Sequence, residues 1–490
     1  MHTSLFDHLR DSRAGTETVL ESGPSKLSLS DLRSRSESLA SDLDLLGAKR
    51  VALYADNGID FIVTDLACQI GNLTLIPLPL FFSPEQIQHA IDSSSVDTIV
   101  ADRDLATVIA SAEPTGVDNI YRLEPRQTAA LPAGTQKITF TSGTTGTPKG
   151  VCLSAEQQLT LAASLASVIG LDKPKHLCVL PLSTLLENLA GVYAPLMAGG
   201  TVVVPTLADV GLTGSSGLDI RQLLACIEHH QPNSLILVPE MLNALTEAAA
   251  AGWQAPQSLQ FVAVGGGKVA PDLLRRACDA GIPAYEGYGL SECASVVCLN
   301  VPGAKRSGSV GMPLPHVNVA TENHQIVVRG NAFLGYVDQP DTWGAGEVQT
   351  GDIGRIDEDG FVYVDGRLKH QLITSFGRNL SPEWVESELL AGPMLYQAVV
   401  IGDDRPFCVA LVFPRDPSCD PSDLYDWIQA VNRRLPDYAR IREWYRLPHA
   451  LSNDDQLLTE NGRPKRTNIE STYQHVIDAM YDIQKEVSAL

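Results

Sequence analysis

The chain lacks the patterns that mark several large classes of protein. No run approaches 18 uncharged apolar residues, so no membrane-spanning helix is expected. The N-terminal residues carry charges throughout and show no apolar signal core, which favours a cytoplasmic location. Positive charge is scarce: 36 Lys and Arg stand against 58 Asp and Glu, giving a net charge of −22. We therefore expect no nucleic-acid partner and no strong attraction to anionic membranes.

Cysteine and nucleotide motifs are also informative by their absence. The 9 cysteines form no CxxC pair, and their odd number without framework spacing predicts reduced thiols rather than disulfides. A nucleophilic role is conceivable for Cys293, but a structural role is expected. The chain has no Gly-Lys-Ser/Thr element of a Walker A motif, which argues against a P-loop NTPase.

The amino-acid composition is typical of a globular protein. Hydrophobic residues make up 44% and charged residues 19% of 490 positions, enough for a large core and about three domain-sized units. Apolar periodicity predicts alternating strands and helices, then short strands from about residue 301, then a fresh α+β run from about residue 367. The main expected elements are strands Arg50–Tyr54, Leu73–Leu78, Ser234–Val238 and Phe261–Val264, and helices Asp60–Ile70, Pro271–Ala280, Pro382–Leu390 and Pro421–Leu435. Such alternation is typical of parallel sheets covered by helices.

The most informative segment is Thr139–Val151, which reads TFTSGTTGTPKGV. Its glycines allow backbone N–H groups to turn towards an anion, and its hydroxyls add further donors. Lys149 supplies one positive charge suited to phosphate oxygens. A flexible Ser/Thr/Gly linker is the alternative, but the segment lies between two apolar stretches and contains Pro-Lys-Gly.

This segment closely resembles the phosphate-binding signature of the AMP-forming adenylating enzymes, which include acyl- and aryl-CoA synthetases, adenylation domains and luciferases. Four further segments resemble elements of the same family and follow in its order: EGYGLSE at Glu286–Glu292, TGD at Thr350–Asp352, GRLK at Gly366–Lys369 and ITSFGRNLSP at Ile373–Pro382. The chain is thereby identified as a member, with similarity along nearly its whole length.

The resemblance implies an α/β fold in two domains. Residues 1–366 would form a large N-terminal domain of two doubly wound subdomains plus a distorted β-barrel. Residues 367–490 would form a small, mobile α+β C-terminal domain that rotates about Lys369. The implied reaction is ATP-dependent activation of a small-molecule carboxylic acid to acyl-AMP with release of pyrophosphate, followed by thioester formation with CoA.

The chemistry requires two anions to meet, so Mg²⁺, cations and backbone donors must offset their repulsion. By resemblance, Glu292 holds the Mg²⁺, while Lys149 and Thr144 take part in catalysis. Asp352 would accept hydrogen bonds from the ribose hydroxyls, since a carboxylate offers acceptors only. The remaining positions expected to bind the nucleotide are Thr141, Ser142, Gly143, Thr145, Gly146, Gly265, Gly266, Gly267, Glu286, Tyr288, Gly289, Ser291, Arg367, Lys369 and Arg378.

The C-terminal catalytic lysine of the family has no exact counterpart. Residues 458–466 read LTENGRPKR, and aligning Gly462 and Arg466 with the family motif puts Arg463 at the lysine position. Lys465 lies two residues further on. We favour Lys465 as the catalytic cation and keep Arg463 as the alternative, because an arginine is bulkier and forked. A surface turn without function would instead indicate a degenerate, non-catalytic adenylate-binding protein.

A medium- or long-chain fatty acid is the expected substrate. Residues 180–191, LPLSTLLENLAG, resemble a stretch of long-chain acyl-CoA synthetases, with Glu187 retained but Thr184 and Asn188 in place of His and Arg. A fatty acyl-AMP ligase that loads an acyl carrier protein has the same first half-reaction and stays open as an alternative.

Overall fold

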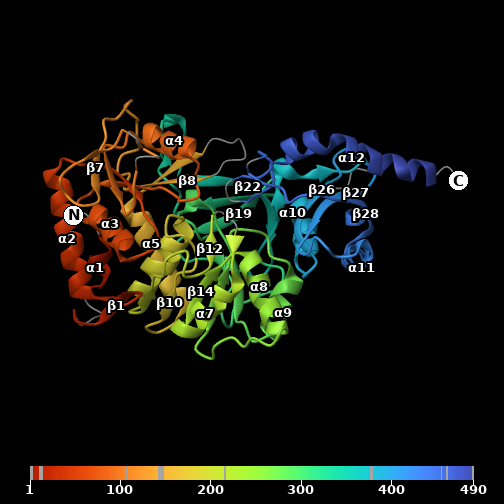
Figure 1. Cartoon of the computed structure of the whole chain (residues 1–490), viewed down its shortest axis with the longest axis horizontal. Coiled ribbons are helices and arrows are strands. Elements are labelled where there is room, and N and C mark those ends of the chain that lie inside the picture. The colour runs from red at the N-terminus through yellow and green to blue at the C-terminus, as the bar shows by residue number, and fades with distance from the viewer. Residues whose placement is uncertain are drawn as a thin grey trace.

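The computed structural model describes residues 4–9, 15–105, 108–109, 111–141, 148–214, 217–375, 379–453, 455–459 and 462–487. Two large β-sheets form the body of the molecule, and helices lie between them and on their outer faces (Figure 1). The alternation of strands and helices has thus produced the covered parallel sheets that the sequence predicts.

The first sheet has nine strands in the order β18-β17-β16-β15-β14-β10-β11-β1-β2. Its central strands from β16 to β1 pair in parallel, and the strands at both ends pair antiparallel. In that order the strands are Met312–Pro313, Cys298–Leu299, Ala284–Tyr288, Phe261–Val264, Ser234–Leu237, Lys175–Leu177, Thr201–Val203, Thr18–Ser22 and Ser25–Ser28.

The second sheet has eight strands in the order β21-β9-β8-β4-β3-β5-β7-β6. Strands β8, β4, β3 and β5 pair in parallel, whereas the outer pairs are antiparallel. In that order the strands are Gly335–Tyr336, Lys149–Leu153, Lys137–Thr141, Thr74–Pro77, Arg50–Tyr54, Thr98–Ala101, Ile120–Arg122 and Glu113–Pro114.

Helices fill the space between the sheets and cover their other faces. Alternate residues of β3 show why both faces are needed: Val51 and Leu53 join the core between the sheets, whereas Ala52 and Tyr54 join the outer core. The inner helices are α2 (Leu29–Leu45), α3 (Ile59–Ile70) and α5 (Ala155–Ile169), and the outer ones are α4 (Pro84–Ser94), α7 (Ile220–His230), α8 (Pro239–Ala250) and α9 (Pro271–Asp279). Shorter elements are α1 (Leu5–Leu9), α6 (Ala194–Met197), β12 (Leu212–Thr213), β13 (Gly217–Leu218) and the 3₁₀ turn η3 (Pro340–Thr342).

A charged pair is fully buried between these layers. The ammonium of Lys137 in β8 lies 3.0 Å from a carboxylate oxygen of Asp65 in α3, and both side chains are 1% exposed. Asn188 and Tyr193 also donate hydrogen bonds to Asp65, at 2.8 and 2.9 Å. Both belong to a short π-helix, η1 (Glu187–Tyr193). Burial lowers the pKa of Lys137, whereas the charge of Asp65 opposes that shift. The pair therefore ties β8, α3 and η1 together.

The β-rich region after residue 301 forms an antiparallel sheet of four strands, in the order β19-β20-β22-β23. The strands are Asn318–Glu322, Gln325–Arg329, Glu347–Ile356 and Val362–Arg367. The expected barrel takes the form of this open sheet, because no ladder joins β19 to β23 in the part of the chain that the structure describes.

The C-terminal segment, which we define as residues 367–490, has its own layers (Figure 1). Strands β26 (Leu395–Ile401), β27 (Cys408–Pro414) and β28 (Ile441–Arg446) form a three-stranded sheet. Helices α10 (Pro382–Leu390) and α11 (Pro421–Asn432) pack on one face, and α12 (Arg466–Val487) packs on the other. A small two-stranded ladder, β24 (Leu372–Ile373) with β25 (Asn379–Leu380), precedes α10.

No helix among the described residues is both long and apolar enough to cross a membrane. All nine cysteines are free, and seven of them are buried. Burial raises the pKa of the Cys293 thiol well above its usual range, so this residue is a poor nucleophile and has the expected structural character.

Candidate active site

The predicted phosphate-binding segment lies between two antiparallel strands of the eight-stranded sheet. Thr141 at the end of β8 is the pairing partner of Lys149 at the start of β9. Lys149 is exposed, as a cation that meets a soluble anion must be. The predicted loop residues Ser142, Gly143, Thr144, Thr145 and Gly146 lie outside the described residues.

A single tyrosine, Tyr336, contacts both Glu292 and Lys149. The sequence analysis did not identify this residue. The hydroxyl of Tyr336 donates a hydrogen bond to Oε1 of Glu292 at 2.7 Å. The ammonium of Lys149 lies over the ring of the same tyrosine, 5.2 Å from its centroid. Glu292 sits in a single 3₁₀ turn, η2 (Ser291–Cys293), which also contains the predicted Ser291. Burial, followed by the charge of Glu292, raises the pKa of Tyr336 and keeps its hydroxyl a donor.

Asp352 forms the second polar centre. It lies in β22, is 3% exposed, and accepts a hydrogen bond from the hydroxyl of Tyr288 at 2.5 Å. The guanidinium of Arg367 lies 2.8 Å from its other carboxylate oxygen. Burial raises the pKa of Asp352, while Arg367 and the Tyr288 hydroxyl oppose that shift. The three predicted residues Tyr288, Asp352 and Arg367 are therefore in direct contact.

The predicted segment Gly265–Gly267 follows β15 and lies near β16, which ends in Tyr288. Gly266 has a φ of +82°, a conformation that favours glycine. Glu286 in β16 is the pairing partner of Val264, which directly precedes this loop; it is 4% exposed and is influenced by the charge of Lys268. Burial raises the pKa of Glu286 to about 7, and Lys268 opposes the shift. Glu286 is thus buried opposite Val264 of β15, away from the open surface.

Gly289 has a packing role in addition to any role in binding. A Cβ at this position would lie 1.6 Å from the carbonyl oxygen of Ser295. Only glycine therefore allows the chain to turn from β16 into η2, which carries Glu292. Lys369 is exposed in a 3₁₀ turn, η4 (Leu368–His370), and Arg378 lies outside the described residues.

The two candidate C-terminal cations differ in where they point. The guanidinium of Arg463 donates a hydrogen bond to the carbonyl oxygen of Gly266 at 2.8 Å. Its charge also acts on Asp352 and Arg367. For Lys465, the contacts in the described part of the chain are made by its backbone, which bonds Leu457, Asn468 and Ile469. The geometry thus favours Arg463, the residue that the sequence analysis kept as the alternative.

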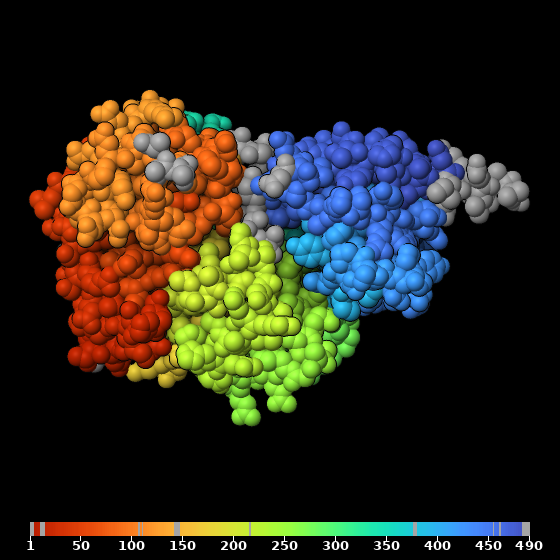
Figure 2. Space-filling view, viewed as in Figure 1, coloured from red at the N-terminus to blue at the C-terminus, as the bar shows by residue number. Residues whose placement is uncertain are grey.

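Polar contacts hold the C-terminal segment against α9. In Figure 2 the blue C-terminal part of the chain lies against the green part. Arg434, two residues beyond the end of α11, pairs with Asp272 of α9 at 3.3 Å. Arg276 of α9 donates a hydrogen bond to the carbonyl oxygen of Ala391. The side chain of Ala391 is buried in the core of the N-terminal sheet. Arg463 reaches Gly266 in this same arrangement of the two parts of the chain.

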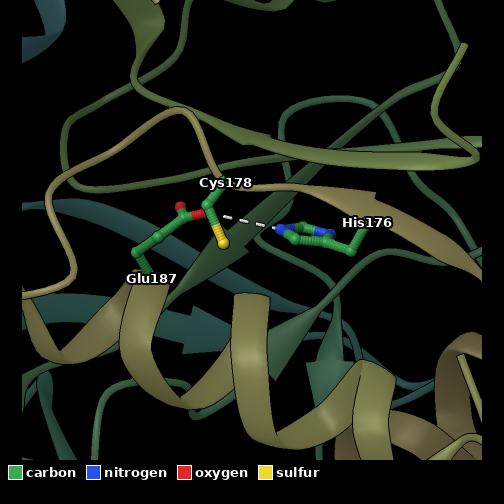
Figure 3. A group of neighbouring side chains, drawn as sticks. All are labelled: His176, Cys178 and Glu187. Carbon is green, nitrogen blue, oxygen red and sulfur yellow. Dashed lines mark hydrogen bonds and ion pairs between the residues drawn. The ribbon is translucent and has the colours of Figure 1, made fainter. Parts of the chain in front are cut away.

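A buried cluster lies apart from these groups, on β10 and η1 (Figure 3). Nε2 of His176 lies 3.3 Å from Oε1 of Glu187, and Nδ1 of His176 lies 2.8 Å from the hydroxyl of Ser234. Figure 3 shows the thiol of Cys178 beside the Glu187 carboxylate. Burial raises the pKa of Glu187, and His176 opposes that shift. A Cβ on Gly191 would lie 2.7 Å from Oε1 of Glu187 and 2.9 Å from Nε2 of His176.

The substrate motif of the sequence analysis is therefore a buried structural element. Glu187 and Asn188 are 0% and 2% exposed and are engaged by His176 and by the Lys137–Asp65 pair. Thr184 donates its hydroxyl to the carbonyl oxygen of Pro181 at 2.6 Å. These side chains stabilise η1 and do not point to a particular acid.

Three contacts at or beside the candidate site were not predicted from the sequence: Tyr336 with Glu292, Lys268 beside Glu286, and Arg434 with Asp272. For the first two contacts, the local sequence contained a pattern that could have indicated them. Lys268 directly follows the three glycines, and Gly335-Tyr336 resembles the glycine–aromatic pairs that bring a backbone close to another strand. The third joins residues 162 positions apart in sequence, 434 against 272, and no local pattern indicates it.

Comparison with known proteins agrees with this geometry. A family model described as AMP-binding enzyme matches residues 9–335, and one described as AMP-binding enzyme C-terminal domain matches residues 369–485. A 2-succinylbenzoate–CoA ligase of Bacillus cereus is 28% identical over 79% of this chain and 83% of its own length. A long-chain-fatty-acid–CoA ligase of Mycobacterium bovis is 25% identical over 90% of this chain and 89% of its own length.

The fold also has solved counterparts. The crystal structure of an anthranilate CoA ligase in complex with anthranoyl-AMP superposes with a TM-score of 0.79, covering 96% of this chain and 97% of that chain at 16% identity. At this identity the likeness concerns the fold. Because the first family model alone matches well over half of the sequence, the chain belongs to the AMP-binding enzyme family.

Proposed function

We propose that the protein is an AMP-forming acid–CoA ligase that uses ATP to activate a carboxylic acid. The observation that carries this proposal is a pair of charged centres made by predicted site residues. Glu292 and Lys149 meet at Tyr336, and Asp352 lies within the influence of Arg367 and Arg463, whose guanidinium binds the glycine loop at Gly266. Such a set supplies both signs of charge that binding a metal–nucleotide complex requires.

In the first half-reaction, a carboxylate oxygen of the acid attacks the α-phosphorus of ATP. An O–P bond forms, the bond to the bridging oxygen breaks, and pyrophosphate leaves with the electron pair. Lys149 would offset charge on the outer phosphates, and Arg463 would offset charge where acid and phosphate meet. Glu292 would hold Mg²⁺, which neutralises phosphate charge when bound.

Asp352 is suited to the ribose. Its carboxylate accepts a hydrogen bond from Tyr288 and forms an ion pair with Arg367, so its position is fixed from two sides. A fixed acceptor binds a pair of hydroxyls with little loss of freedom. In the second half-reaction, the thiol of CoA attacks the acyl carbonyl and AMP leaves, while the thiol proton passes to solvent.

For the acid we propose a medium- or long-chain fatty acid, which the relative from Mycobacterium bovis favours. An aryl acid is the second candidate, favoured by the relative named for 2-succinylbenzoate. The side chains that suggested a fatty acid are buried in η1, so the choice between the two rests on these relatives.

The test is an acid panel of stepped aliphatic chain lengths and substituted aryl acids, incubated with Mg²⁺, ATP and hydroxylamine. Formation of hydroxamate and pyrophosphate with at least one acid is expected. Repeating the assay with CoA and with an acyl carrier protein identifies the acceptor. A thioester formed only on the carrier protein would assign the chain to acyl-AMP ligases.

Lys149→Ala and Glu292→Ala test whether the activity comes from the candidate site. Each is expected to reduce hydroxamate formation by roughly 10²–10³-fold, while the midpoint of thermal unfolding changes little. If no acid supports ATP–pyrophosphate exchange although the protein binds AMP, the proposal is wrong and the chain is a non-catalytic adenylate-binding protein.

A further inference from the structure

One side chain joins the two ends of the proposed phosphate site. The hydroxyl of Tyr336 donates a hydrogen bond to Oε1 of Glu292 at 2.7 Å. The ammonium of Lys149 lies over the ring of Tyr336, 5.2 Å from its centroid. Within the described part of the chain, the other oxygen of Glu292 has no hydrogen-bond partner. The bond through Oε1 orients the carboxylate, and the other oxygen is the one that we expect to meet a cation.

Tyr336 itself is held from several directions. Its backbone N–H donates to the hydroxyl of Thr342 at 3.0 Å, and its carbonyl oxygen accepts from the indole of Trp343 at 2.8 Å. Its ring contacts Phe333 edge-on, with centroids 4.8 Å apart. The backbone N–H of Phe333 in turn donates to the carbonyl oxygen of Glu292 at 2.7 Å.

The strand that carries Tyr336 is also fixed to the strand that carries Lys149. Strand β21 pairs with β9, with Tyr336 opposite Val151. Gly335 has a φ of +137°, and a Cβ there would lie 2.3 Å from the indole of Trp343, so only glycine fits. The segment from Phe333 to Trp343 thus clamps Glu292 on one side and Lys149 on the other.

We propose that Tyr336 is a positioning residue that orients Glu292 for Mg²⁺ and restrains Lys149 beside the phosphates. This inference rests on the proposed function, since it assumes that Glu292 meets a metal–nucleotide complex. Groups that hold a metal ligand in place typically change metal affinity or activity by about 10–100-fold when removed.

The test separates the hydroxyl from the ring. Binding of a non-hydrolysable ATP analogue is measured by calorimetry across a series of Mg²⁺ concentrations, and binding of AMP is measured without metal. In Tyr336→Phe, the half-saturating Mg²⁺ concentration is expected to rise by about 10-fold or more, with AMP affinity unchanged. Tyr336→Leu also removes the ring beneath Lys149. Its affinity for the analogue is expected to be about two- to fivefold lower than that of Tyr336→Phe.

Tyr363→Phe is the matched control, because Tyr363 lies in β23 and donates its hydroxyl to a different carboxylate, Asp357, at 3.1 Å. This variant should bind Mg²⁺ and analogue like the native protein. A Tyr336→Phe protein with unchanged Mg²⁺ dependence would overturn the inference, as would one that loses AMP binding to the same extent. If the native protein itself shows no Mg²⁺-dependent analogue binding, the proposed function fails instead.

Discussion

Arg463 and Lys465 stand two residues apart, yet the structure separates them by what their side chains contact. Arg463 donates to the carbonyl oxygen of Gly266, whereas the contacts of Lys465 run through its backbone. We therefore expect Arg463→Ala to slow adenylation by roughly 10²–10³-fold, with little effect of Lys465→Ala. Pyrophosphate exchange measures this step. Transfer from preformed acyl-AMP to CoA should be largely spared in both variants, and a slow Lys465→Ala enzyme beside a normal Arg463→Ala enzyme would reverse the assignment.

Glu286 gives the site a pH dependence of stability. Its pKa is raised from 4.5 to about 7 in the folded protein. The folded state therefore holds a proton that the unfolded state has lost, and this contribution to stability is present below about pH 4.5 and disappears as pH rises through about 7. Glu286→Gln, which cannot ionise, should lose less thermal stability than the native protein between these pH values. If the melting temperatures of the two proteins change with pH in the same way across that range, the raised pKa of Glu286 is contradicted.

At the scale of elements, the buried pair of Lys137 and Asp65 makes a stability prediction. Lys137→Met leaves Asp65 charged and buried with fewer partners, which should destabilise the fold by about 3–5 kcal/mol. The double variant Lys137→Met with Asp65→Asn removes both charges and should recover part of that loss. Denaturant midpoints followed by intrinsic fluorescence measure both. A double variant no more stable than the single one would show that the packing, not the stranded charge, sets the cost.

Elements with clear local signals were predicted closely. Strand Phe261–Val264 and helix Pro382–Leu390 were found with the expected bounds, because turn residues or a proline mark their ends. Helix α11 was expected to reach Leu435 but ends at Asn432. Pro436 disfavours a helical conformation at Leu435, and both amide atoms of Asn432 bond the backbone of Ile441 instead.

The candidate site was predictable only where its residues lie in one motif. The sequence located Glu292, Asp352 and Lys149 as separate motifs, and their predicted roles stay predictions. It did not reveal that Tyr336 connects two of them, because that contact spans 44 residues. The π-helix η1 was also missed, since Glu187 and Asn188 are polar residues whose burial depends on distant partners.

For the molecule as a whole, the central question is whether the C-terminal segment moves. We expect rotation about Lys369, because one rigid site serves adenylation and thioester formation poorly. The contacts to be broken, such as Arg434 with Asp272, are partly exposed and individually weak. Lys369→Pro restricts the backbone in η4 and should spare adenylation while impairing thioester formation. Lys369→Ala, which removes the charge but keeps the backbone free, should retain both steps, and equal loss of both steps in the proline variant would count against the hinge.

The buried pair of His176 and Glu187 also bears on how chains of this family diverge. Any side chain at position 191 would collide with both members of the pair, at 2.7 and 2.9 Å from a Cβ. A substitution of Gly191 is therefore expected only in a lineage that has already lost both the imidazole and the carboxylate. Sequences of relatives should accordingly show position 191 varying together with positions 176 and 187, and reconstructed ancestors should pass through the loss of the pair before the loss of the glycine.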